Sequence, residues 1–154
     1  MRAYLTIGIP ASGKTVWAQE AVMDRLPSHD LVRVERDVVR KRLKVGNGEA
    51  EELVTQRCRR DIECAAFALW DAILSDTNLN TKFRKELVLF LKDLEFTVEA
   101  VVFDTPFWVC FWRNLWRPNR VPFSVMWRMQ KRRKKLTDRA LIDEGFEAVS
   151  HILT

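Results

Sequence analysis

One stretch decides the fold: Gly8-Ile9-Pro10-Ala11-Ser12-Gly13-Lys14-Thr15, which completes the G-x-x-x-x-G-K-[ST] pattern of a phosphate-binding (Walker A) loop. A β-type run at residues 4–7 precedes it, and residues 16–25 can follow it as a helix. In such a strand–loop–helix, backbone N–H groups and the helix N-terminus point at phosphate oxygens. Lys14 can then reach the β and γ phosphates, and the Thr15 hydroxyl can bind Mg²⁺. The sequence therefore predicts a site for ATP and Mg²⁺.

The composition is that of an ordinary globular domain. The 154 residues are enough for one domain with a sizeable core. No stretch approaches the roughly 18 uninterrupted apolar residues of a membrane span, so we expect no membrane partner. The first strand leaves no room for a secretory signal. Cys58, Cys64 and Cys110 are odd in number and lack C-x-x-C spacing. They predict a reducing cytoplasm without disulfides or zinc, with Cys58 and Cys64 in or near a helical core.

The positive charge is concentrated in one segment. Residues 105–137 carry a formal charge of +9, against +5 for the whole chain, and contain no Asp or Glu. A basic segment on an otherwise acidic body is typical of proteins that bind a polyanion, nucleic acid above all. The alternative is a solvated helical face. The nine cations are Arg113, Arg117, Arg120, Arg128, Lys131, Arg132, Arg133, Lys134 and Lys135.

Strand and helix patterns alternate along the chain. Further strands are expected at residues 31–35, 73–74 and 97–103, with helices at 38–44, 49–72, 82–94, 107–116 and 125–136. Breaks are expected at Pro27-Ser28 and at residues 46–48. This alternation predicts a three-layer α/β sandwich around a central parallel sheet, with ligands outside the carboxyl ends of the strands. Residues 138–154 fit either an extra helix or an edge strand. The helix at 49–72 is expected to use Leu53, Cys64, Phe67 and Leu69 at helical spacing.

Two acids follow predicted strands and are candidates for chemistry. Asp37 follows the second strand and can accept a proton from an attacking hydroxyl, with Arg40 one turn away to hold an anionic substrate. The alternative for Asp37 is a helix N-cap. Asp76 ends the third strand, where an acid often serves Mg²⁺ in phosphoryl-transfer proteins. Its alternative is a turn residue.

Arg113 and Arg117 are candidates for a lid over the phosphates. They lie four apart, so one helix face would carry both, just before a break at Pro118 where a lid could hinge. The planar guanidinium makes two bonds to phosphate oxygens, and a closing lid excludes water.

Trp108, Trp112 and Trp116 recur every four residues, among Phe107 and Phe111. Such a stripe can stack nucleic-acid bases. A buried face or a subunit contact is the interpretation we favour, so oligomers are possible. His29 and His151 are isolated, and no role is assigned to them.

A series of short motifs then occurs in a recognisable order. In sequence they are Thr6-Ile7-Gly8, Pro10, Gly13-Lys14-Thr15, Trp17-Ala18, Arg36-Asp37, Arg40, Ser75-Asp76-Thr77-Asn78-Leu79-Asn80, Phe103-Asp104, Pro106, Arg113-Asn114, Arg117 and Val121-Pro122. In these motifs, over most of residues 3–136, the chain resembles the 5′-kinase domain of phage polynucleotide kinases. The Ser-Asp-Thr-Asn-Leu-Asn string makes this resemblance much more specific than the loop alone.

The resemblance implies a single P-loop kinase domain over residues 1–154, with a helical lid at about 107–122 and a basic helix at about 123–136. It implies a phage-encoded enzyme of the host cytoplasm. Gly8, Pro10, Ala11, Ser12 and Gly13 would line the phosphate site. Further roles follow by position: Lys14 and Thr15 for the donor phosphates and Mg²⁺, Asp37 as general base, Arg40 and Thr77 for the acceptor phosphate, Asp76 for the metal, and Arg117 and Arg113 for the donor phosphates.

The sequence departs from the family in three ways. The D-x-D-G-T motif of its phosphatase domain is absent, so end-healing by this chain alone is not supported. Ala11 replaces a common Gly, which should be tolerated if this residue keeps a negative φ. Trp112, Trp116 and Trp127 are atypical.

The predicted function is ATP-dependent phosphorylation of a 5′-hydroxyl of DNA or RNA, DNA being preferred. The main alternative is a phage kinase acting on 5-hydroxymethyluracil in DNA, a base that must be flipped out of the duplex. A small-molecule kinase fits less well, because a small acceptor needs no extended basic surface. A non-catalytic nucleotide-binding module is the remaining alternative.

Overall fold

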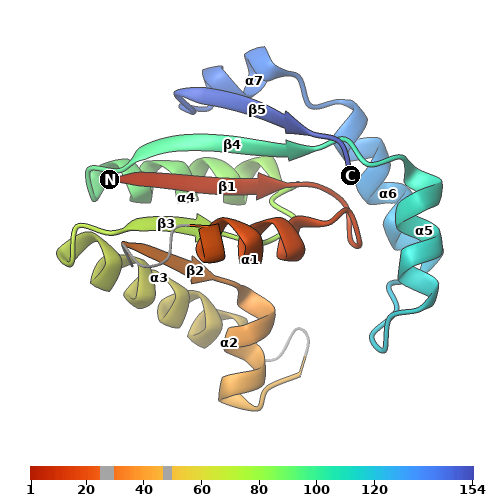
Figure 1. The fold of residues 1–154 in the computed structure, drawn as a ribbon, viewed down its shortest axis with the longest axis horizontal. Coiled ribbons are helices and arrows are strands. Elements are labelled where there is room, and N and C mark those ends of the chain that lie inside the picture. The colour runs from red at the N-terminus through yellow and green to blue at the C-terminus, as the bar shows by residue number, and fades with distance from the viewer. Residues whose placement is uncertain (25–29, 47–49) are drawn as a thin grey trace.

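The structure, a computed structural model, describes residues 1–24, 30–46 and 50–154. Five parallel strands form one sheet in the order β2-β3-β1-β4-β5, with helices on both faces (Figure 1). The α/β sandwich predicted from the sequence is therefore confirmed. The strands are β1 (Arg2–Ile7), β2 (Leu31–Val34), β3 (Asp71–Leu74), β4 (Thr97–Phe103) and β5 (Ala148–Ile152).

The helices connect these strands, and the phosphate loop lies between β1 and the first of them. In Figure 1, α1 lies in front of the sheet and α4 behind it, while α5 and α6 lie beyond the carboxyl ends of the strands. No helix among the described residues is long and apolar enough to span a membrane. The helices are α1 (Lys14–Asp24), α2 (Arg36–Leu43), α3 (Glu51–Phe67), α4 (Thr81–Asp93), α5 (Phe107–Leu115), α6 (Phe123–Lys134) and α7 (Asp138–Asp143).

The two central strands carry the core. The last residues of both strands, 5–7 in β1 and 100–103 in β4, are almost fully buried in succession, because helices cover both faces of the sheet. The fully buried residues of these strands include Ala3, Leu5, Ile7, Val98 and Ala100. A rigid centre of this kind fixes the strand ends at which the loop and the acids lie.

Residues 138–154 form both of the elements between which the sequence did not decide. The short helix α7 ends at Asp143, and Gly145, two residues further on, has a left-handed φ of +105°. The chain then pairs with β4 as the edge strand β5, with Glu99 opposite Ala148 and Phe103 opposite Ile152.

The prediction for the third helix was wrong in its length and in its buried face. The helix α3 ends at Phe67, and Leu69 has a left-handed φ of +60°. The helix ends there because residues 71–74 form the strand β3, which pairs with β2 and β1. Leu53, Cys64, Phe67 and Leu69 are exposed, so Cys64 is not a core residue. The buried face consists of Val54, Cys58, Ile62 and Ala65. Both sets have helical spacing, and only the position of the sheet distinguishes them.

The breaks expected at Pro27-Ser28 and at Asn47-Gly48 lie outside the described residues, as does His29.

Candidate active site

The phosphate loop needs its first glycine for steric reasons. A Cβ on Gly8 would lie 2.7 Å from Ser12 Oγ and 3.0 Å from Phe103 Cβ. Gly13 has a φ of +93°, a conformation that side chains rarely adopt. Ala11 has a φ of +64°, so the condition under which alanine would be tolerated without strain is not met. Because Ala11 has a Cβ, this left-handed conformation costs about 1 kcal/mol.

The Lys14 side chain is folded back onto the loop. Its Nζ donates to Gly8 O at 3.0 Å, Ile9 O at 2.6 Å and Ser12 Oγ at 3.2 Å. Burial lowers the pKa of Lys14 to about 8, while the Asp76 charge acts in the opposite direction. A phosphate bound in the loop would favour the charged ammonium and would therefore raise the pKa of Lys14 again. Pro10 is buried beside it, and Thr15 lies exposed in the first turn of α1.

The segment after β3 is tied to β1 and to the loop. Thr6 Oγ1 donates to Asp76 O at 3.0 Å, and Asn78 Nδ2 donates to Thr6 O at 2.9 Å. The Gly8 N–H donates to Thr77 O at 3.1 Å. Asn80 caps α4, since its Oδ1 accepts from the backbone N–H groups of the first turn. The unusual string that carries the resemblance therefore fixes the loop against the neighbouring strand.

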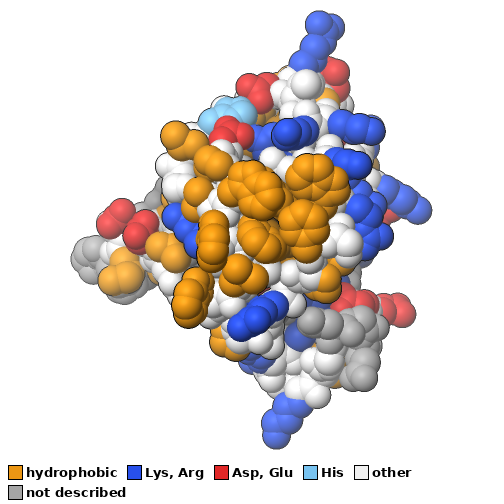
Figure 2. Space-filling view, turned by 90° about the vertical axis from the view of Figure 1, so that its right-hand side faces the viewer, with side chains coloured by type: hydrophobic (Ala, Val, Ile, Leu, Met, Phe, Trp, Pro, Cys, Tyr) orange, Lys and Arg blue, Asp and Glu red, His pale blue; other side chains and the backbone are white. Residues whose placement is uncertain are grey.

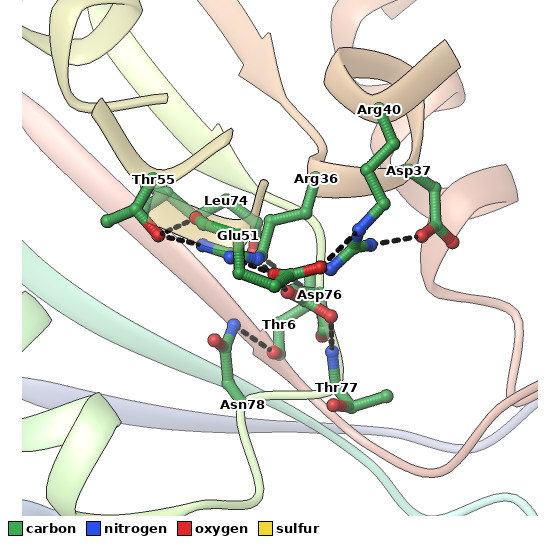
Figure 3. Close-up of polar contacts among 10 residues, drawn as sticks. All are labelled: Thr6, Arg36, Asp37, Arg40, Glu51, Thr55, Leu74, Asp76, Thr77 and Asn78. Carbon is green, nitrogen blue, oxygen red and sulfur yellow. Dashed lines mark hydrogen bonds and ion pairs between the residues drawn. The ribbon is translucent and has the colours of Figure 1, made fainter. Parts of the chain in front are cut away.

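Asp76 lies at the carboxyl end of β3, as expected. Its Oδ1 accepts the Thr77 N–H at 2.7 Å, and its Oδ2 lies 3.8 Å from Arg36 Nε (Figure 3). Burial raises the pKa of Asp76, and the Thr77 N–H and the Arg36 charge oppose that rise. This carboxylate belongs to the site electrostatically, because its charge also acts on the pKa of Lys14.

Asp37 and Arg40 lie together in the first turns of α2. Arg40 Nη1 donates to Asp37 Oδ1 at 2.7 Å, while 75% of the Asp37 side chain remains exposed. Glu35 occupies the N-cap position of α2, so Asp37 is not the N-cap. The carboxylate is accessible to an acceptor molecule and has a cation beside it.

Glu51 is a site residue that the sequence did not indicate. Its Oε1 accepts from Arg40 Nε at 2.9 Å, and its Oε2 accepts from Arg40 Nη2 at 3.0 Å and from Arg36 Nη2 at 2.6 Å. The Arg40 and Arg36 hydrogen bonds lower the pKa of Glu51 to about 2. Figure 3 shows Glu51 between the two guanidinium groups. An acid in the first turn of a helix stabilises that helix whether or not it has another role. The sequence therefore does not reveal that Glu51 also binds the two arginines.

The two candidate lid arginines do not share a helix face. The helix α5 contains Arg113 but ends at Leu115, so Arg117 lies in the turn beyond it. The Arg117 charge nevertheless lowers the pKa of Lys14. Arg113 Nη1 lies 3.5 Å from Thr154 Oγ1, which donates to Ser12 O at 2.9 Å. Both arginines are therefore associated with the loop.

The tryptophan stripe is exposed. Trp108, Trp112 and Trp116 have 61%, 62% and 85% of their surface exposed, so a buried face is excluded for them.

His151 has a structural role that the sequence did not show, because its ring nitrogens lie 2.5 Å from Asp104 Oδ2 and 2.9 Å from Asp138 Oδ1.

Several solved structures are similar to this chain. A chain of the Pnkp1/Rnl/Hen1 RNA repair complex has a TM-score of 0.68 and 20% identity over 88% of this chain and 46% of its own length. A chain of the PezAT toxin-antitoxin system of Streptococcus pneumoniae has a TM-score of 0.64 and 15% identity, covering 99% of this chain and 68% of its own. The tunicamycin resistance protein of Deinococcus radiodurans has a TM-score of 0.61 and 19% identity, covering 100% and 87%.

These TM-scores establish a shared P-loop kinase-like fold. The chain spans less than half the length of the RNA repair chain. The model of one protein family, AAA_33, described as an AAA domain, matches residues 4–136. Because this match covers most of the chain, including the loop and the candidate acids Asp37 and Asp76, the chain belongs to the AAA domain family AAA_33.

Proposed function

We propose that this protein is an ATP-dependent kinase that transfers the γ-phosphate to a 5′-hydroxyl of DNA or RNA, with Asp37 as the general base. The observation that carries the proposal is a continuous set of polar contacts from an exposed carboxylate to the phosphate loop, which Figure 3 shows from Asp37 as far as Thr77. It starts with the Asp37–Arg40 pair at 2.7 Å and ends where Gly8 N–H donates to Thr77 O. Its members in between are Glu51, Arg36 and Asp76.

On the donor side, the loop N–H groups and Lys14 would bind the β and γ phosphates, with Arg113 and Arg117 covering them. The Thr15 hydroxyl and the Asp76 carboxylate fit a hard cation, because both are oxygen donors and Asp76 Oδ2 lies as far as 3.8 Å from Arg36 Nε. They would hold Mg²⁺, whose charge offsets that of the phosphates.

On the acceptor side, Asp37 would take the proton from the attacking hydroxyl. A bond then forms between that oxygen and the γ phosphorus, the bond to the β,γ-bridging oxygen breaks, and ADP leaves. Arg40 would bind the phosphate next to the acceptor nucleoside, with Thr77 beside it. General-base removal of this kind typically contributes 10²- to 10⁴-fold in rate.

A second acceptor would use the same residues. Because 75% of the Asp37 side chain is exposed, a hydroxymethyl group on a flipped-out base such as 5-hydroxymethyluracil can also approach it. The excess of cations in residues 105–137 favours either polymer over a small molecule.

The test uses ATP labelled in the γ-phosphate and three acceptors: a 5′-hydroxyl oligonucleotide, an end-blocked duplex with internal 5-hydroxymethyluracil, and a nucleoside. We expect label on the oligonucleotide. Asp37→Asn should lose at least 10²-fold in turnover while keeping its affinity for ATP. Asp93→Asn, at an exposed acid in the last turn of α4, is the matched control and should keep full activity.

Label on the blocked duplex alone would replace the first acceptor by the second. Label on the nucleoside alone would refute a nucleic-acid acceptor. Full turnover by Asp37→Asn would refute its role as the base.

A further inference from the structure

Five aromatic side chains of the two lid helices are exposed on one face. Trp108 and Trp112 of α5, Trp116 at its end, and Phe123 and Trp127 of α6 have between 43% and 85% of their surface exposed. We call these five residues the aromatic face. Figure 2 shows hydrophobic side chains gathered at the centre of this side of the molecule, with Lys and Arg around them. Exposed apolar patches of this kind usually mark binding sites.

Three members of the aromatic face, Trp108, Phe123 and Trp127, are supported by the rings of Phe107 and Phe111. Phe107, only 8% exposed, lies 5.3 Å from Trp127 and 5.7 Å from Phe123 between ring centroids. Phe123 and Trp127 are stacked at 14°. Phe111 contacts both Trp108 and Phe123 edge-on. Rings held in this way lose little conformational freedom on binding a ligand.

The charge around the aromatic face specifies the chemistry of its partner. Residues 105–137 contain nine cations and no acid. Arg133 pairs with Asp104, and the other eight lie beyond ion-pair distance of any carboxylate within residues 1–24, 30–46 and 50–154. Lys131 lies 5.9 Å from the Trp127 ring centroid. A partner must therefore combine regularly spaced negative charge with flat apolar surfaces, as unpaired nucleotides do.

A second copy of the chain fits this face poorly. A two-fold contact would place the cations of two acid-free segments close to each other, and like charges repel. The aromatic face is also linked to the active site, because α5 contains Arg113, which contacts Thr154, and Thr154 contacts Ser12 of the phosphate loop. A polymer that binds on α5 and α6 is therefore beside the site of transfer.

We propose that the aromatic face stacks unpaired bases of a single-stranded nucleic acid while the arginines and lysines around it bind the phosphates. The proposal rests on the proposed function, because it makes the single-stranded polymer the acceptor. One base stacked on one ring is expected to raise the affinity roughly tenfold.

The experiment compares two ligands with the same phosphates. One is a labelled single-stranded oligonucleotide of about 12 nucleotides, within the usual size of such sites, and the other is its abasic counterpart. Binding is measured by fluorescence anisotropy without ATP. The wild type should bind the oligonucleotide at least tenfold more tightly than the abasic ligand. Trp112→Ala and Trp116→Ala should each reduce that preference roughly tenfold and leave abasic binding unchanged.

The control is Trp70→Ala. Trp70 is 39% exposed and directly precedes the amino end of β3, whereas α5 and α6 lie beyond the carboxyl ends of the strands, so this variant should behave as wild type. Circular dichroism and Tm verify that each variant is folded. Equal affinity for the two ligands, or an unchanged preference in both α5 variants, would overturn the proposal.

Two further measurements test other occupants of the face. The first uses anionic vesicles of phosphatidylserine and phosphatidylcholine. If Trp112→Ala and Trp116→Ala weaken vesicle binding but leave the affinity for the oligonucleotide unchanged, the aromatic face binds a membrane surface. The second is sedimentation: a dimer that Trp112→Ala dissociates would show that the aromatic face binds a second copy of the chain.

Base-dependent binding without phosphorylation would refute the kinase reaction alone. Phosphorylation without base-dependent binding would refute the aromatic face alone.

Discussion

Arg40 and Glu51 face each other across the junction of α2 and α3, joined by two hydrogen bonds of 2.9 and 3.0 Å. The same guanidinium donates to Asp37, so Glu51 sets the orientation of the arginine beside the proposed base. The hydrogen bond to Glu51 is also the main reason that the pKa of Arg40 is raised. In the proposed reaction, an acceptor phosphate would bind an arginine that already has two carboxylate partners.

Glu51→Gln should lower the free energy of unfolding by about 1 kcal/mol at neutral pH, a modest value because the pair is partly solvated. Arg40 and Arg36 lower the pKa of Glu51 from 4.5 to about 2, so the stabilisation is present above about pH 4.5 and is lost as the pH falls toward 2. Urea denaturation of both proteins over this range measures it. Glu52→Gln, which removes an acid from the same helical turn, is the control. Equal losses in the two variants would show a helix-dipole effect instead.

Arg40→Lys should raise the KM for the oligonucleotide about tenfold and change kcat little. Lysine keeps the charge but cannot make two parallel bonds to Glu51 and a further one to Asp37. Steady-state kinetics with a varied acceptor and saturating ATP provide the measurement. Arg42→Lys, at an exposed arginine of the same helix, should leave both constants unchanged. A fall in kcat with an unchanged KM would place Arg40 in the chemical step instead.

ATP affinity should decrease as the pH rises above about 8. Burial lowers the pKa of Lys14 to about 8, and only the protonated amine pairs with phosphate. Linkage then predicts a constant Kd below about pH 8 and a weakening of up to about tenfold per pH unit above it. Isothermal titration calorimetry at several pH values measures this dependence. Lys14→Met should bind more weakly and show a flat profile; a wild-type Kd unchanged at about pH 9.5 would contradict the prediction.

His151→Gln should destabilise the protein more at low pH than at high pH. The hydrogen bond to Asp104 is the main reason that the pKa of His151 is raised above its usual 6.5, and the hydrogen bond to Asp138 adds to this rise. The stabilisation is therefore complete below about pH 6.5 and is lost as the pH rises through the raised value. Because 42% of the side chain is exposed, we expect about 0.5 kcal/mol. Thermal melts at about pH 5.5 and pH 9 test it, and an equal difference at both would rule out the charged histidine.

Much of the candidate site follows from local rules. The loop pattern places a phosphate site between β1 and α1, and alternating elements bring Asp37 and Asp76 to the same edge of the sheet. These features depend on neighbours in the sequence, or on the parallel order of the strands, which the pattern of elements itself suggests.

Other features depend on partners far away in the chain. The helix α3 has two apolar stripes of helical spacing, and burial selects the one with Val54 and Ile62 only because the sheet lies on that side. Arg40 and Glu51 are 11 residues apart on different helices, and no periodicity relates them. Residues 148–152 become a strand because β4 has an open edge to pair with.

The sequence alone thus determined the phosphate loop, the alternation of strands and helices, the two acids at strand ends and the basic segment, because each is written in local spacing or composition. Tertiary structure decided which faces are buried, the left-handed conformation of Ala11, the Glu51 contacts and the exposure of Trp108, Trp112 and Trp116. Burial and long-range pairing are properties of elements packed together, and a single element cannot encode the surface against which it lies.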